Sequence, residues 1–230
     1  MNNLKIIGTS HIAKQSIEEI KKAVEEFQPQ IIAVELDAQR AAALMQEQKS
    51  KISLRDIQKI GVKGYAFVKI GHYIQQKLGK SVGISPGSEM KTALEIAHKN
   101  NLQVALIDQP INITLKNFSK ELTWKEKWHF FSDLIKGLLF PKRQIKNYGL
   151  EEFDLRAVPE QQVILKIINQ MKKHYPSIYK TIIADRDKYM VRQLVKIMRE
   201  HPDKKILVVV GAGHQEGMEK LLLKVEVVRD

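Results

Sequence analysis

Cysteine is absent from this chain of 230 residues. Disulfide bonds and thiolate chemistry are therefore excluded, and any metal site must use nitrogen and oxygen ligands. No apolar run reaches the roughly 18 to 20 residues that a membrane-spanning helix needs. The apolar run near the N-terminus, which ends at Gly8, is also too short for the core of a secretory signal. These absences predict a cytoplasmic protein.

Aromatic residues are few, and acidic residues are outnumbered by basic ones. Aromatic residues make up 7% of the chain, and 26 Asp and Glu stand against 38 Lys and Arg, a net charge of +12. Such a charge favours acidic partners, such as nucleic acid or an anionic membrane face. The basic residues are scattered, however, and are not interleaved with the aromatic residues that base stacking requires. We therefore expect a solvated lysine-rich surface and no nucleic-acid partner, while peripheral membrane contact and a homo-oligomer stay open.

Short apolar runs at residues 4–8, 31–34, 104–107 and 206–210 have the length and composition of buried strands. A fifth run, residues 225–228, is expected to close the chain as a last strand. Segments of helical periodicity separate the runs, and the first strand, helix and strand follow one another within 35 residues. This order predicts an α/β fold with a largely parallel central sheet flanked by helices.

The segment from about 111 to 150 differs in composition from its surroundings. It contains both tryptophans, Trp124 and Trp128, together with several basic residues. We expect one or two amphipathic helices there, separated near Pro141, that form a lid or cap. Residues 1–230 would then form a single domain with this helical insertion.

Two glycine-x-x-histidine turns, Gly8 to His11 and Gly211 to His214, carry the sharpest chemical signal. Each follows a predicted strand and opens a helix, at the sheet edge where ligands bind in α/β folds. A histidine in the first turn of a helix feels the positive end of the helix dipole, which disfavours the imidazolium form. The neutral imidazole is the form that a metal ligand or a general base requires.

Carboxylates arrive at the same edge of the predicted sheet. Glu35 and Asp37 follow the second strand, and Asp108 follows the third. Two histidines and a carboxylate form a familiar open ligand set for zinc or a similar divalent ion. Purely structural interpretations of these residues are also open. A helix-capping histidine is more often structural, Glu89 can be a dipole-stabilised carboxylate, and residues 185–190 are typical of a solvated helix face.

Six motifs, in order along the chain, resemble those of the TraB/PrgY pheromone-shutdown family. They are Gly-Thr-Ser-His (8–11), Val-Glu-Leu-Asp with Arg40 (34–40), Gly-Ser-Glu-Met (87–90), Leu-Ile-Asp (106–108), Asp-Arg-Asp-Lys-Tyr-Met (185–190) and Val-Val-Gly-Ala-Gly-His (209–214). That family is similar in its paired Gly-x-x-His motifs to the Tiki metal-dependent proteases. It is grouped more loosely with the erythromycin-esterase and ChaN-like folds.

The resemblance implies a metal-dependent hydrolase, a peptidase acting on small peptides or signal peptides. The divalent metal ion, whether zinc, manganese or cobalt, would be held by His11, His214 and Glu35. The implied catalytic residues are Glu89, Arg186 and Asp37. Glu89 or Asp37 would be the base, and Arg186 would stabilise the transition state. The alternative is a non-catalytic protein that binds and sequesters a peptide or small-molecule signal.

The chain departs from the family pattern in two places. Gln109 follows Asp108 at a position where the family usually carries arginine. Many family members also carry a C-terminal membrane region, which the residues up to Asp230 do not contain. We therefore expect no transmembrane segment.

Overall fold

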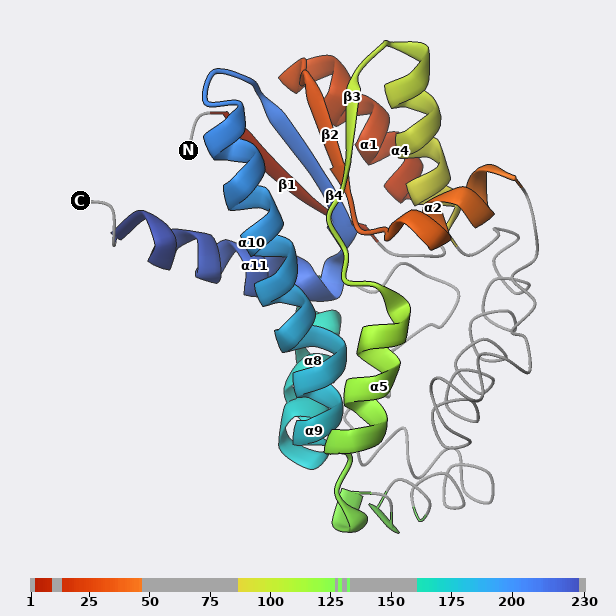
Figure 1. The fold of residues 1–230 in the computed structure, drawn as a ribbon, viewed down its shortest axis with the longest axis vertical. Coiled ribbons are helices and arrows are strands. Elements are labelled where there is room, and N and C mark those ends of the chain that lie inside the picture. The colour runs from red at the N-terminus through yellow and green to blue at the C-terminus, as the bar shows by residue number, and fades with distance from the viewer. Residues whose placement is uncertain are drawn as a thin grey trace.

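In the computed structural model, parallel strands form a sheet with helices on both of its faces (Figure 1). The structure describes residues 3–9, 14–46, 87–126, 128–129, 132 and 161–227. The strands within these ranges are β1 (Leu4–Thr9), β2 (Ile31–Val34), β3 (Gln103–Leu106) and β4 (Ile206–Gly211). The predicted α/β class with a parallel sheet is therefore confirmed.

The strand order is β1-β4-β2-β3, so the last strand in the sequence lies between the first two. Gly8 of β1 is in register with Val210 of β4, and Thr9 is in register with Gly211. The hydroxyl of Thr9 also donates to the carbonyl oxygen of Val210, at 3.1 Å. The two strand ends that lead into the Gly-x-x-His motifs therefore lie side by side.

Two pairs of helices sandwich the sheet. Helices α1 (Lys14–Phe27) and α4 (Ser88–Lys99) pack on one face, and α10 (Asp185–Glu200) and α11 (Ala212–Val227) pack on the other (Figure 1). Residues of β2 alternate between these layers: Ile32 and Val34 pack with α1 and α4, while Ile31 and Ala33 pack with α10 and α11. This alternation follows from the two-residue period of a strand. Because both faces of β2 are buried, its sequence is continuously apolar.

Four further helices of the described residues lie near the carboxyl ends of the strands: α2 (Ala38–Met45), α5 (Ile111–Glu121), α8 (Gln161–His174) and α9 (Pro176–Tyr179). Helix α9 contacts α5 and α8, and α8 also contacts α11; these helices lie beyond the strand ends (Figure 1). Helix α5 agrees with the first part of the predicted insertion at about 111–150, most of which lies outside the described residues.

A π-helical segment, η1 (Lys180–Ala184), joins α9 directly to α10. Such segments are rare and often occur at functional sites, because the wider turn changes the direction of the side chains that follow. The carbonyl oxygen of Ile182 accepts a hydrogen bond from Nη1 of Arg186, at 3.3 Å. This segment thus leads straight into a residue that the family resemblance singles out.

Two expectations about strands were wrong. Residues 225–227 belong to α11 and do not form a last strand, because a run of four apolar residues can pack equally well on a helix. The third strand was expected to be buried, yet Val104 and Leu106 of β3 are 40% and 38% exposed. Strand β3 is an edge strand, and an apolar run alone does not reveal a strand's place in a sheet.

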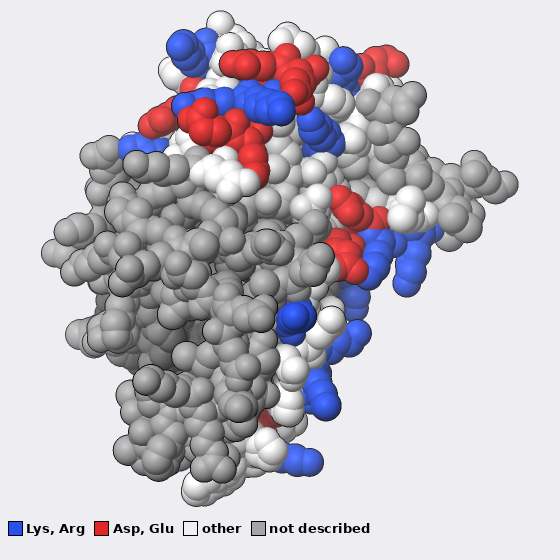
Figure 2. Space-filling model, turned by 180° about the vertical axis from the view of Figure 1, so that it is seen from behind, with Lys and Arg blue, Asp and Glu red and all other residues white. Residues whose placement is uncertain are grey.

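On the face that Figure 2 shows, Lys or Arg of the described residues often lies beside Asp or Glu. On α1, for example, Lys21 pairs with Glu18 at 2.9 Å and Lys22 pairs with Glu26 at 3.7 Å. Exposed pairs of this kind are solvated and contribute little to stability. None of the helices in the described ranges is long and apolar enough to cross a bilayer.

Candidate functional site

Buried charged side chains gather where β2, β3 and β4 end and α10 and α11 begin. Five of them are at most 6% exposed: Glu35, Asp37, Asp108, Asp187 and His214. Each follows a strand or stands in the first turn of a helix. Burying so much charge is costly unless the groups are paired and hydrogen-bonded, so the pairing within this cluster decides what it can do.

Arg186 is the central cation of this cluster. Its Nε donates to Oδ1 of Asp108 at 3.0 Å, and its Nη2 donates to Oδ2 of Asp108 at 2.7 Å and to Oε1 of Glu35. Burial lowers the pKa of Arg186, but the carboxylates of Glu35 and Asp108 outweigh it, and the net effect raises the pKa. The guanidinium therefore stays charged and holds both carboxylates in place.

Glu35 joins three elements at its position just after β2. Its Oε2 accepts the backbone N–H of Gly211 at 2.6 Å, at the end of β4. Its Oε1, which accepts from Arg186 of α10, lies 3.5 Å from Nε2 of His214. The carboxylate predicted as a metal ligand and the second motif histidine are thus neighbours.

The imidazole of His214 is held from both sides. Its Nδ1 lies 2.6 Å from Oδ1 of Asp187, and its Nε2 lies 3.2 Å from Nη1 of Arg186. Because a guanidinium can only donate, Nε2 must accept, which places the proton of a neutral ring on Nδ1. Burial raises the pKa of Asp187 above its ordinary value, because it outweighs the hydrogen bond with His214, which lowers the pKa. The Nε2 lone pair thus accepts from Arg186, and Nε2 lies 3.5 Å from Oε1 of Glu35.

Asp37 connects two helices of the site. Its Oδ1 accepts the backbone N–H of Arg40 at 2.9 Å and caps α2, and its Oδ2 accepts the backbone N–H of Ile111 at 3.1 Å, at the start of α5. Aspartate is a preferred helix-capping residue because its oxygens satisfy free N–H groups in the first turn. The catalytic role of Asp37 stays a prediction. A catalytic Asp37 would have to act while its oxygens accept these two backbone hydrogen bonds.

Asp108 receives a second guanidinium from Arg40, whose Nη1 lies 2.8 Å from Oδ2. Gln109, which stands where the family usually carries arginine, is buried and donates from Nε2 to Oγ1 of Thr114 at 2.9 Å. In this chain Gln109 therefore stabilises the start of α5, and Arg40 adds a second positive charge at Asp108 beside that of Arg186.

The roles of two further predicted site residues, Glu89 and His11, stay predictions. Glu89 is 1% exposed in the first turn of α4, where the helix dipole stabilises a carboxylate, and its role as a base stays a prediction. His11 lies outside the described residues, so its role as a metal ligand also stays a prediction. Within the described ranges, no three His, Asp or Glu side chains form a group that could hold a metal ion.

Sequence reasoning missed Asp187. The solvated-face interpretation of residues 185–190 holds for Asp185, which pairs with Lys180 at 2.8 Å, but is wrong for Asp187, which is 3% exposed. The buried residues of α10 are Asp187, Met190, Val191 and Leu194. Their spacing is that of an apolar helix face, so the periodicity of this helix could have placed Asp187 inside.

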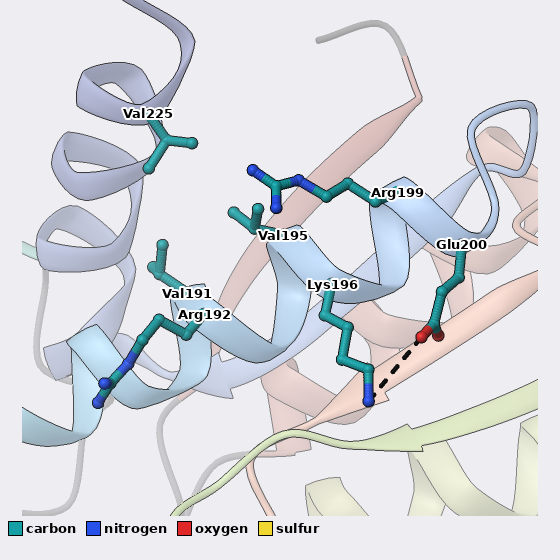
Figure 3. Close-up of a pocket in the computed structure, with 7 residues that line it drawn as sticks. All are labelled: Val191, Arg192, Val195, Lys196, Arg199, Glu200 and Val225. Atoms are coloured by element: carbon teal, nitrogen blue, oxygen red, sulfur yellow. Dashed lines mark ion pairs between the residues drawn. The ribbon is translucent and has the colours of Figure 1, made fainter. Parts of the chain in front are cut away.

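A groove of about 560 Å³ lies elsewhere, between α10 and the end of α11 (Figure 3). Val191, Val195 and Val225 form part of its wall, and Arg199 extends beside Val195 (Figure 3). Lys196 and Glu200 point away from the valines and pair with each other at 3.8 Å. Its lining residues are Val191, Arg192, Val195, Lys196, Arg199, Glu200 and Val225. No member of the buried cluster is among them, so the groove is separate from the candidate site.

Comparison with known proteins places the chain in a family. The sequence model of the TraB/PrgY/gumN family matches residues 2–226. The uncharacterized protein MJ1365 of Methanocaldococcus jannaschii is 36% identical over 229 residues, which cover 96% of this chain and 53% of that protein. The TraB domain-containing proteins of Mus musculus and Homo sapiens are each 26% identical over 243 residues, which cover 94% of this chain and 61% of theirs.

This chain thus spans less than two thirds of the length of each of these relatives. Among solved structures, a mutant of the erythromycin esterase EreC in its open conformation is similar, with 14% identity and a TM-score of 0.31. The match covers 91% of this chain and 60% of the esterase, and a likeness so distant does not bear on the chemistry of the site. The family match, in contrast, runs from the first strand to the last helix. The chain belongs to the TraB/PrgY/gumN family.

Proposed function

We propose that this chain is a metal-dependent hydrolase of small peptides, with His11, Glu35 and His214 as the ligands of a divalent ion. The observation that carries the proposal is the separation of 3.5 Å between Oε1 of Glu35 and Nε2 of His214. Two ligand atoms at about 2.0 to 2.1 Å from one tetrahedral zinc ion stand about 3.4 Å apart. The donor atoms of Glu35 and His214 therefore have the spacing for a shared ion, which would take the place of the Arg186 N–H groups that these two atoms face.

The surroundings of His214 support the same proposal. Metal-binding histidines commonly donate their second ring N–H to a carboxylate, which fixes the tautomer and the ring orientation. Asp187 is such a carboxylate, 2.6 Å from Nδ1 of His214. The register of β1 and β4 adds a third element, because it brings the strand that leads to His11 beside the strand that leads to His214.

A bound divalent ion would supply an activated water and polarise the scissile carbonyl. The residues of the chain would orient the reacting groups. Glu89 is the proposed base, since both oxygens of Asp37 already accept backbone hydrogen bonds. For Arg186 to stabilise developing negative charge, one of its N–H groups would exchange a protein acceptor for a substrate oxygen. Helix α5 would border the substrate beyond the strand ends.

Metal content tests the ligand set. The purified protein would be analysed by mass spectrometry for zinc, manganese and cobalt, beside the His11→Ala, Glu35→Ala and His214→Ala variants. We expect near-stoichiometric metal in the unchanged protein and its loss in all three variants. His98→Ala is the matched control, because His98 is exposed on α4. Full metal content in the three ligand variants would contradict the proposal.

Peptide cleavage tests the reaction. A mixture of short peptides would be incubated with the metal-loaded protein and with the His214→Ala variant, and products would be identified by mass spectrometry. Cleavage that needs both metal and His214 is the expected result. Saturable peptide binding without any product, and without a need for metal, would contradict hydrolysis and favour a sequestering protein.

A further inference from the structure

Gly217 stands in the interior of α11, where glycine is among the least favourable residues. Its place is explained by Asp187 of the neighbouring helix α10. A Cβ atom at position 217 would overlap Oδ2 of Asp187 and lie 3.1 Å from its Cγ. The Asp187 carboxylate therefore occupies the space that any other residue at this position would fill.

The same carboxylate holds His214. Oδ1 of Asp187 lies 2.6 Å from Nδ1 of His214, while Oδ2 lies against Gly217. His214 and Gly217 are three residues apart and hence lie on one face of α11. The Asp187 carboxylate spans this face, with one oxygen for the imidazole and the other in the gap left by glycine.

We propose that Gly217 is a positioning residue that acts through Asp187 on the ring of His214. This inference rests on the proposed role of His214. Asp187 is 3% exposed, so its carboxylate cannot retreat into solvent if position 217 gains a side chain. Oδ1 of Asp187 would have to move away from Nδ1, and the ring would lose the acceptor of its Nδ1–H, one of the two partners that orient it.

A double-mutant cycle tests the contact. Gly217→Ala would be made in the unchanged protein and in an Asp187→Ala variant, and melting temperatures would be measured. We expect Gly217→Ala to lower Tm by about 4 to 8 °C in the unchanged protein and not to lower it when Asp187 is absent. An equal loss in both backgrounds would overturn the proposal, as would failure of both Gly217→Ala variants to fold.

Gly213→Ala is the matched control in the same helix. A Cβ atom at position 213 would lie 3.5 Å from Cδ1 of Ile168 and 3.9 Å from Cδ1 of Ile183, which are ordinary contacts. We expect this variant to melt at or above the temperature of the unchanged protein. A loss of stability equal to that of Gly217→Ala would mean that any alanine in α11 is harmful, and would overturn the proposal.

Nitrogen-15 NMR of histidine-labelled protein reads the effect on the ring. Because Arg186 still donates to Nε2, we expect the Nδ1–H tautomer of His214 in all three proteins. The Nδ1–H proton signal should stay at the low field typical of a short hydrogen bond in the unchanged protein and in Gly213→Ala, and should move upfield in Gly217→Ala, where the bond to Asp187 is lost. An unmoved Nδ1–H signal in Gly217→Ala would overturn the positioning role. Neither the melting curves nor this spectrum requires metal or turnover, so a protein without hydrolase activity would refute the proposed function and leave this result readable.

Discussion

Asp108 and Arg186 form a two-point ion pair, with Nε of Arg186 3.0 Å from Oδ1 and Nη2 2.7 Å from Oδ2 of Asp108. The pair ties the residues after β3 to the first turn of α10, across 78 positions of sequence. The planar fork of arginine matches a carboxylate in this geometry, which makes the pair strong and directional. Because Nη2 also reaches Glu35, this ion pair fixes the carboxylate proposed to bind metal.

Replacing Asp108 by asparagine should destabilise the fold. The change removes the negative charge that faces Arg186 and Arg40, and a buried charge without its partner costs about 3 kcal/mol or more. Urea denaturation would measure the free energy of unfolding. Asp185→Asn is the control, because Asp185 pairs with Lys180 at the surface, where a pair contributes less than about 1 kcal/mol. Equal losses in the two variants would contradict a special role for the buried pair.

Arg186→Gln should tighten metal binding although it weakens the fold. The guanidinium lies against Oε1 of Glu35 and 3.2 Å from Nε2 of His214, so it repels a second cation there. Removing that charge should lower the Kd for a divalent ion at least about tenfold, measured by isothermal titration calorimetry with zinc. Arg192→Gln, an exposed arginine bonded to its own helix, should leave the Kd unchanged. Weaker zinc binding in Arg186→Gln would show that Arg186 assembles the site instead of competing for it.

Glu126 should make stability depend on pH. It is 5% exposed, and its oxygens accept the N–H of Ser177 at 2.7 Å and the N–H and hydroxyl of Thr123 at 3.1 and 2.7 Å. Burial raises the pKa of Glu126, but these hydrogen bonds outweigh it and leave the pKa below its ordinary 4.5. A lowered pKa stabilises the fold above 4.5, and this contribution disappears as the pH falls through the folded-state value.

Glu126→Gln should therefore lower the free energy of unfolding by about 1 to 2 kcal/mol at pH 7. The difference from the unchanged protein should shrink as the pH falls from 5 toward 3. Urea denaturation at several pH values would measure it. Glu95→Gln serves as the control, because Glu95 is exposed and pairs only loosely with Lys91, at 3.8 Å. A loss that stays constant with pH would contradict the assignment to the Glu126 carboxylate.

Gly8→Ala should disturb the junction of β1 and α11. A Cβ atom there would lie 2.5 Å from Oε1 of Gln215 and 2.9 Å from Cα of Ala212. The first contact is with a side chain and can be relieved, but the second is with backbone. We expect a loss of about 2 kcal/mol or more, measured by thermal denaturation, of which Gln215→Ala restores only part. Full restoration would show that the backbone of α11 can move away from β1.

Local sequence determined most of the secondary structure. The runs at 31–34 and 206–210 became β2 and β4 almost unchanged, since short apolar runs next to glycine, proline or carboxylates form strands that bury both faces. The placing of Glu35 and Asp108 at the strand ends was equally predictable, because parallel strands end at one edge of the sheet. The exposed β3 was not, because the same apolar run serves in the middle and at the edge of a sheet.

Tertiary structure alone decided which side chains of the site pair with one another. Strand β4 lies between β1 and β2, and only this order brings the N–H of Gly211 to Glu35. Whether the guanidinium of Arg186 faces solvent or pairs with carboxylates depends on how α10 packs on the sheet. The local sequence pattern does not predict that packing. The glycine at position 217 is explained only by the contact with Asp187 that the fold creates. Strands and caps depend on neighbouring residues, whereas buried ion pairs and close contacts depend on groups that folding brings together from distant parts of the chain.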